Sequence, residues 1–236
     1  REDGKRSVEE EYGDKLKSQG YYKGMIPPHV FRCSNTNKFL VFEELAHFRY
    51  WYKKQKKPYI HSVINEHRPF RFNLELDIKK ELLDGIKLTE DNLKTIKKHN
   101  GLFSVDYFKS RQLCLLKIRD LIHSVLEQHY FIEPTDKFYY FAEDNRKEKH
   151  SYRIYANIAI ANKNEYNHFI TLLHDEIDDR KQRIPYWAVL HQIIDPTGYC
   201  LRLPGSWKDD HQMKWMTANC CIDDAVLSNT FEPNDA

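Results

Sequence analysis

The stretch FRFNLELDIK at residues 70–79 decides the fold class, because its side chains alternate in character at every position. Apolar residues stand at the even-numbered positions, and polar or charged residues stand at the odd-numbered ones. A period of two is the period of a β-strand, which sends successive side chains to opposite faces of a sheet. We therefore predict a strand over 70–79 that turns one face toward a core and carries Glu75 and Asp77 on the other.

Segments on either side of this strand extend the pattern. Further strands are expected at 59–64, 137–142, 151–161, 188–194, 199–204 and 213–217, and helices at 38–57, 89–99, 105–130 and 162–183. The polar residues 65–68 are short enough to join the first two strands as a hairpin. Because strands and helices do not alternate strictly, the sequence predicts an α+β fold with a mostly antiparallel sheet flanked by helices.

The composition is that of a folded protein with a balanced charge. The chain has 236 residues, of which 41% are hydrophobic and 14% aromatic, so a core can form. Charged residues make up 31%, yet the net charge is only +2, which excludes a highly basic tail. A local basic groove is still compatible with this balance, because binding depends on where the charge lies.

One such local concentration closes the helix expected at 38–57. Its last turns carry Arg49, Lys53, Lys54, Lys56 and Lys57 beside several aromatic residues. Cations suit the carboxyl-terminal end of a helix, so a solvated helix end is one interpretation. A surface that contacts phosphates next to aromatic rings is the other.

Cysteine usage and hydropathy indicate an intracellular protein. The five cysteines, at 33, 114, 200, 220 and 221, are odd in number and form no CxxC pair. This argues against a disulfide framework and a cysteine-rich zinc site, and favours free thiols. No apolar run reaches the roughly 18–20 residues of a membrane span, so we expect no membrane partner.

Glu75 and Asp77 are the first candidate functional residues. Two residues apart on a strand, they point the same way with Cα atoms roughly 6.5–7 Å apart. Two carboxylates on one face repel each other unless water or a cation lies over them. Mg²⁺ and Mn²⁺ prefer carboxylate oxygens, so a metal site is one interpretation and a solvent-facing polar edge is the other.

Two later clusters add positive charge. The sequence KHSYRIY at 149–155 leads into a strand on which Ser151 and Arg153 share a face. Farther on, Ile194-Asp195 precedes a strand in which Arg202 is flanked by Leu201 and Leu203. A buried arginine needs an anionic partner, which either a triphosphate or one of the acids would supply.

Taken in order, these motifs resemble those of the archaeo-eukaryotic primase superfamily. The family's acidic pair, D/E-x-D/E after an apolar run, is similar to residues 74–77. Its Ser-x-His strand is similar to 151–153. Its apolar–Asp element, followed by an Arg-bearing strand and a basic residue, is similar to 194–195, 201–203 and Lys208.

The resemblance spans residues 60–220 and is strongest to the primase domain of primase–helicases from nucleocytoplasmic large DNA viruses of the poxvirus and African swine fever virus type. It implies an RRM-like catalytic core over 58–220, a helical segment over 1–57 packed on that core, and a tail or linker over 221–236. It also implies a helicase domain farther along the parent chain and, for a viral protein, work in the host cytoplasm.

By the same resemblance, the chain is a DNA primase, a nucleotidyltransferase that builds primers from nucleoside triphosphates on a single-stranded DNA template. The residues expected to hold two Mg²⁺ or Mn²⁺ ions are Glu75, Asp77 and Asp195. The residues expected to grip the triphosphate are Ser151, Arg153, Arg202 and Lys208. A 3′-hydroxyl would attack the α-phosphate, and pyrophosphate would leave.

Arg153 departs from the family pattern, which usually has His at this position. Arginine also binds phosphate, bidentately and without needing a proton. The first alternative to an active enzyme is therefore a catalytically degenerate domain of primase fold that holds nucleic acid. A second alternative is a metal-dependent nuclease, because Asp77-Ile78-Lys79 matches the D/E-x-K element of restriction-like nucleases, although the upstream Pro-Asp partner is absent.

Overall fold

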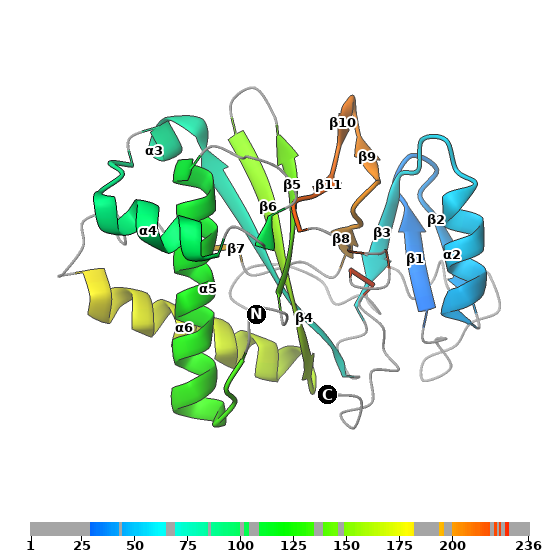
Figure 1. Ribbon diagram of the computed structural model, residues 1–236. Helices are drawn as coiled ribbons and strands as arrows, with labels where there is room; N and C mark the ends of the chain where they lie inside the picture. Colours follow the sequence, from blue (N-terminus) through cyan, green and yellow to red (C-terminus); the bar gives the residue numbers. More distant parts are fainter. Residues whose placement is uncertain are drawn as a thin grey trace.

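The computed structural model of the chain describes a mixed α+β molecule with antiparallel sheets (Figure 1). It describes residues 29–42, 44–64, 69–84, 86–99, 102–103, 109–134, 139–145, 149–181, 194–195, 200–217, 220, 222 and 225–226. Its strands are β1 (His29–Cys33), β2 (Lys38–Phe42), β3 (Ile60–Val63), β4 (Phe70–Lys79), β5 (Tyr139–Asn145), β6 (Lys149–Ile160), β7 (Ile194–Asp195), β8 (Cys200–Arg202), β9 (Trp207–Lys208), β10 (His211–Gln212) and β11 (Lys214–Trp215). Its helices are α2 (Leu45–Lys53), α3 (Lys80–Asp84), α4 (Glu90–Lys98), α5 (Lys109–Tyr130) and α6 (Lys163–Lys181).

A five-stranded antiparallel sheet, in the order β11-β5-β6-β4-β7, forms the centre of the molecule. The alternation expected of β4 is confirmed, because all five of its apolar side chains are buried. They face α5 and α6, where the Phe72 and Phe169 ring centroids lie 4.9 Å apart in an edge-to-face contact. The apolar residues of α5 from Leu113 to Leu126 are buried as well, so this helix and β4 share one core.

A second, four-stranded sheet has the order β2-β1-β3-β8 and is covered by α2. Phe31 of β1 stacks on Phe48 of α2 with ring centroids 3.7 Å apart and planes 6° from parallel. Both rings are fully buried, which fixes the helix on this sheet. Because β1 pairs with β3, residues on either side of position 57 belong to one sheet.

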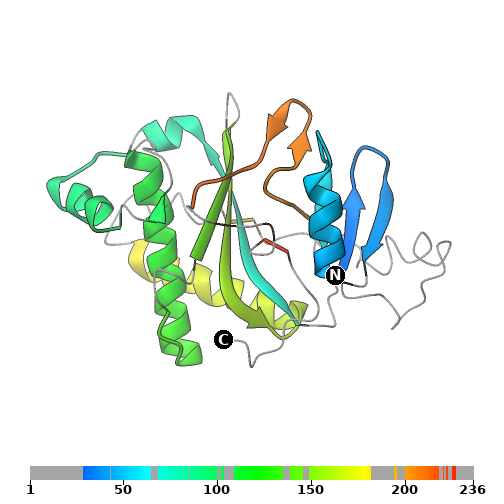
Figure 2. The ribbon, with the colours of Figure 1, turned by 45° about the vertical axis from the view of Figure 1, so that its right-hand side comes forward.

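The two sheets stand side by side, with helices on the outside. Figures 1 and 2 both show α5 and α6 on one side of the five-stranded sheet, and the four-stranded sheet with α2 on the other. The even-numbered residues of β4 face the helices, so its odd-numbered residues face the four-stranded sheet. The polar face predicted from the sequence therefore lies between the two sheets.

The expectation of a helix over 38–57 is wrong in its first part. Residues Lys38–Phe42 form β2, which pairs with β1 through a turn at 34–37, and the helix covers only Leu45–Lys53. The turn places Asn37 at φ 54°, a conformation that asparagine tolerates better than most residues. The short apolar run at 38–42 fits a helix or a strand equally well, and pairing with β1 decides between them.

The remaining helices and the strands β3, β4, β5, β6, β8 and β11 lie within a few residues of their expected positions. The elements β1, α3, β9 and β10 were not expected. The strand expected at 188–194 lies outside the described residues except for Ile194. Among the described helices, none has the length and apolar character needed to cross a membrane. Cys33 and Cys114 are free thiols.

Candidate active site between the two sheets

Two rows of side chains cross the inner face of the five-stranded sheet. Residues directly opposite each other in antiparallel strands share a face. The first row, from β7 to β11, consists of Asp195, Glu75, Arg153, Ala142 and Trp215. The second row consists of Asp77, Ser151 and Asp144. The register thus brings the three predicted acidic positions to one face, although the side chain of Asp195 lies outside the described part.

Glu75 forms an ion pair with Arg153 on the neighbouring strand. The Arg153 side chain is buried, and its Nη1 also donates to the carbonyl oxygen of Tyr152. A buried guanidinium without a carboxylate partner would be costly, so the pair stabilises Arg153 in this position. Arg153 therefore stands beside Glu75 on the inner face of the sheet.

Asp77 is held by two donors from the start of β6. Ser151 Oγ donates to its Oδ1, and Lys149 Nζ donates to its Oδ2, each over 2.5 Å. Partial burial alone would raise the pKa of the Asp77 carboxyl. The hydrogen bonds from Lys149 and Ser151, with the charges of Lys149 and Arg153, outweigh that effect and lower the pKa.

An ion pair between Arg202 of β8 and Asp144 of β5 joins the two sheets. Their side chains are 4% and 0% exposed, so the pair is buried in the layer between the sheets. Arg202 Nη1 also donates to the carbonyl oxygen of His211 over 3.4 Å. Of the two partners considered for Arg202 from the sequence, the structure contains an acid, Asp144.

The pKa of His61 on β3 is affected by several positive charges on this side of the site. Its pKa is lowered to about 4, first by burial and then by the charges of Arg202, Arg32, Arg153 and Lys208. The imidazole therefore stays neutral at physiological pH. The four cations that act on it come from β1, β6, β8 and β9, so segments far apart in the sequence form one basic wall.

Tyr155 lies on the same face of β6 as Arg153 and is fully buried. Its ring meets that of Trp215 edge-on, with centroids 5.8 Å apart. Burial raises the pKa of its hydroxyl, which makes no hydrogen bond within the described part of the chain. A buried hydroxyl of this kind is a polar group that a ligand between the sheets can satisfy.

Tyr52 of α2 fixes the segment that connects Arg202 to Lys208. Its hydroxyl lies 2.9 Å from the carbonyl oxygen of Pro204, to which it donates, and 2.8 Å from Ser206 Oγ. The backbone N–H of Ile60 donates to the same Ser206 Oγ over 3.2 Å. Burial raises the pKa of Tyr52 to about 12, partly offset by its hydrogen bond to Ser206, so the phenol remains a donor.

Lys208 lies at the outer end of this segment and is exposed. It lines an open hollow of about 350 Å³ together with Ser34, Asn35, Tyr59 and Asp209. It makes no hydrogen bond or ion pair with the described carboxylates of the inner face, so it lies at the rim of the site rather than among the acids. Its charge nevertheless acts on His61.

The carboxylates of Glu75 and Asp77 fit a hard divalent cation in their chemistry, because they are half-buried oxygen donors on one face. Each is neutralised by a cation of β6, which a metal ion would replace. Within the described side chains, no group of three or more His, Cys, Asp or Glu residues is arranged to hold a metal. Asp195, the third predicted ligand, is known here by its backbone register alone.

Three residues of the site were not singled out from the sequence, namely Lys149, Asp144 and His61. Lys149 stands two residues before Ser151, so its place on the same strand face was available as a signal. Asp144 was missed because the strand was expected to end at 142, whereas β5 continues to Asn145. His61 had no local signal, since its importance comes from cations of other strands.

The arrangement combines acidic oxygens with a basic wall, which suits a polyanionic ligand held together with a divalent cation. Comparison with known proteins finds no protein-family model and no curated protein that matches this chain. The functional interpretation is therefore based on the geometry of the site.

Proposed function

We propose that this chain is a primase-type nucleotidyltransferase domain that joins nucleotides from nucleoside triphosphates on a single-stranded DNA template. The observation that supports the proposal best is the shared face of Glu75, Asp77 and Asp195, which lies opposite the strand that carries Arg202. The resemblance of the motifs extends the proposal to viral DNA replication, with a helicase domain in the parent chain.

In this proposal, Glu75, Asp77 and Asp195 hold Mg²⁺ or Mn²⁺. The bound ions supply charge stabilisation at phosphoryl oxygens and make the primer 3′-hydroxyl more acidic. Binding of a cation at the carboxylates releases the positive charge of Arg153 and Lys149 for phosphate oxygens of the nucleotide. The chain thus contributes positioning and charge, with no covalent intermediate.

In this proposal, the phosphates of the nucleotide are bound by Ser151, Arg153, Arg202 and Lys208. Ser151 offers a hydroxyl donor, and Arg153 offers a planar pair of N–H donors where the family has His. Arg202 is held by Asp144, which orients its guanidinium within the layer between the sheets. Lys208 stands at the rim, where an exposed ammonium suits the outermost phosphates.

Primer extension with a labelled primer–template and Mg²⁺ or Mn²⁺ tests the proposal. We expect Glu75→Gln and Asp77→Asn each to reduce incorporation by at least about 100-fold, because loss of a residue that only supports a metal ligand already costs about 10–100-fold. The matched control is Asp179→Asn, which makes the same change at an exposed position on α6. Normal synthesis by Asp77→Asn would show the metal assignment to be wrong, and strand cleavage without incorporation would assign a nuclease instead.

A specific observation supports a second candidate, a nucleic-acid-binding module of the same fold without catalysis. The two described carboxylates of the proposed metal site are already neutralised, Glu75 by Arg153 and Asp77 by Lys149, so these positions are balanced in charge within the chain itself. Calorimetry with a nucleoside triphosphate and Mn²⁺ separates the two candidates. Binding of single-stranded DNA with no metal-dependent binding of nucleotide would select the module.

A further inference from the structure

The carboxyl-terminal end of α2 and the residues around it form an exposed surface of lysines and aromatic rings. We name it the α2 platform and define it by Tyr50, Lys53, Lys54, Lys56, Lys57 and Trp207. The segment 45–57 contains five Lys or Arg residues and no Asp or Glu. This is the densest stretch of positive charge in the chain, and no acidic residue within the segment offsets it.

Lysine ammonium groups lie close to the aromatic rings of the platform. Tyr50 is 66% exposed, and Lys54 Nζ lies 3.8 Å from the centroid of its ring. Lys57 Nζ lies 4.7 Å from the centroid of Trp207 and 5.7 Å from that of Tyr59. The Tyr50 ring therefore stands in solvent beside an ammonium group, where one more flat ring, such as a nucleobase, has room to stack on it.

The positive charge of the platform is largely uncompensated. Lys53, Lys54 and Lys56 have no carboxylate partner among the residues that the structure describes. Lys57 lies 3.6 Å from Asp210, but the Asp210 side chain is 97% exposed, and such surface pairs contribute little. The platform is therefore able to exchange water and counterions for an anionic partner.

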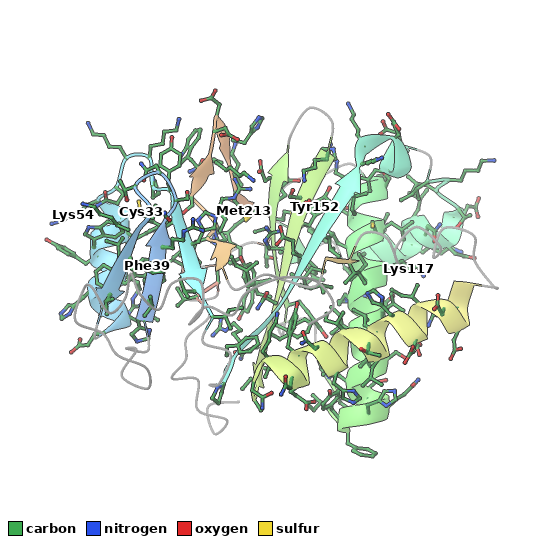
Figure 3. All side chains as sticks on the ribbon, turned by 180° about the vertical axis from the view of Figure 1, so that it is seen from behind. Cys33, Phe39, Lys54, Lys117, Tyr152 and Met213 are labelled. Atoms are coloured by element: carbon green, nitrogen blue, oxygen red, sulfur yellow. The ribbon has the colours of Figure 1, made fainter. Side chains whose placement is uncertain are left out.

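The platform faces the same end of the molecule as the candidate active site. Figure 1 shows the β9–β10 hairpin at the upper edge, the edge to which the α3 end of β4 also points. Figure 3, from behind, shows Lys54 on the outer flank of the molecule, with Cys33 beside it. The hollow beside Lys208 and Tyr59 lies next to Lys57, so the platform continues toward the rim of the site.

We propose that the α2 platform binds single-stranded nucleic acid. That this strand is the template rests on the proposed function. Lysines that follow one helix end contact successive phosphates, while Tyr50 offers a face for an unpaired base. Duplex DNA keeps its bases stacked inside and cannot use that ring. An acidic polypeptide would use the lysines alone, so the exposed ring favours a single strand.

The test is fluorescence anisotropy of a labelled oligothymidylate with the full chain, without nucleotide and with EDTA present. Lys53→Gln/Lys54→Gln/Lys56→Gln is compared with Lys94→Gln/Lys97→Gln/Lys98→Gln, which removes the same charge from the exposed end of α4. We expect the platform variant alone to bind at least tenfold more weakly. The slope of log affinity against log salt should fall by about 2, since each phosphate contact to a single strand contributes about 0.7.

Tyr50 separates stacking from charge. We expect Tyr50→Ala to weaken binding about fivefold or more and Tyr50→Phe to retain it, because stacking needs the ring and not the hydroxyl. Circular dichroism checks that each variant is folded, and Tyr50, being exposed, can be truncated without opening the core.

Three results would overturn the proposal. They are equal affinities of the platform and α4 variants, equal affinity for duplex and single strand, and displacement of the oligonucleotide by polyglutamate at equal charge concentration. Since the assay contains neither metal nor nucleotide, its outcome is independent of catalysis. Failure of primer extension with intact strand binding would reject the proposed function and leave the platform in place.

Discussion

The guanidinium of Arg202 on β8 is ion-paired with the carboxylate of Asp144 on β5, and this pair is the direct link between the two sheets inside the candidate site. Its strands belong to different sheets, whose order is β2-β1-β3-β8 and β11-β5-β6-β4-β7. The geometry of the polar layer between the sheets therefore depends on this contact.

Removing one partner of the pair should destabilise the fold strongly. Asp144→Ala leaves the Arg202 guanidinium buried without a carboxylate, which costs about 3–5 kcal/mol in comparable buried pairs. Urea unfolding followed by circular dichroism measures the change. The double variant Asp144→Leu/Arg202→Met should lose less than the sum of its two single variants, because it leaves no uncompensated charge. Strict additivity would mean that the two side chains do not interact.

Gly205 should not tolerate a side chain. Its φ is +89°, and a Cβ atom built there would stand 3.0 Å from the Tyr52 hydroxyl oxygen. We expect Gly205→Ala to lower the free energy of unfolding by about 1–2 kcal/mol from the backbone conformation alone, with a further loss from the contact. In a Tyr52→Phe background the oxygen is absent, so the cost of Gly205→Ala should fall toward the backbone part. An unchanged cost in that background would show that the contact is unimportant.

Stability should decrease as the pH falls from about 6.5 to about 4. Burial, followed by the charges of Arg111 and Lys80, lowers the pKa of His150 to about 4, despite the opposing charge of Asp84. Because the unfolded histidine binds its proton near pH 6.5, the unfolded chain gains protons first and is favoured in this window. For His150 the loss of stability grows through this window and levels off below about pH 4, where the folded imidazole is protonated as well.

His150→Leu tests that assignment, since the variant cannot titrate at this position. Its free energy of unfolding should change less between pH 7 and pH 4.5 than that of the unaltered chain. His61 remains and acts in the same direction over this range, because its pKa is also lowered to about 4, whereas the lowered pKa of Asp77 acts mainly at lower pH. Equal pH dependence of the two proteins would contradict the burial of a neutral His150.

Metal affinity should rise when the cation on Asp77 is removed. Lys149 Nζ lies 2.5 Å from Asp77 Oδ2, where it competes with a metal ion for the carboxylate. We expect Lys149→Met to bind Mn²⁺ several-fold more tightly, as measured by calorimetry without nucleotide. Lys79→Met is the control, because Lys79 is the strand partner of Lys149, whereas the described donors to Asp77 are Lys149 and Ser151. An equal gain in both variants would indicate a general charge effect in place of direct competition.

The strand β4 illustrates what could be predicted from local sequence. Its period of two assigned the side chains of residues 70–79 to the correct faces, because successive residues of a strand point to opposite sides of the sheet. The helices α5 and α6 were equally visible from their apolar spacing. The prediction of a helix at 38–42 was wrong because one basic and four apolar residues are too few to distinguish a helical period from a strand period. The partner strand β1 was also not recognised from the sequence.

The site was predictable only in part, for a similar reason. The shared face of Glu75 with Asp77, and of Ser151 with Arg153, follows from spacing within single strands. The bond from Arg202 to Asp144 does not, since it joins residues from two sheets. No periodicity within either segment could have selected that partner among the acids of the chain.

The order of residues therefore determined which side chains share a strand face and which helices have an apolar side, because these are properties of neighbours along the backbone. The tertiary structure decided that β7 and β6 flank β4, and that β8 stands across from β5. This strand order forms because distant segments bury their apolar side chains in one common core. The same packing places Asp195 opposite Glu75 and brings the four cations around His61.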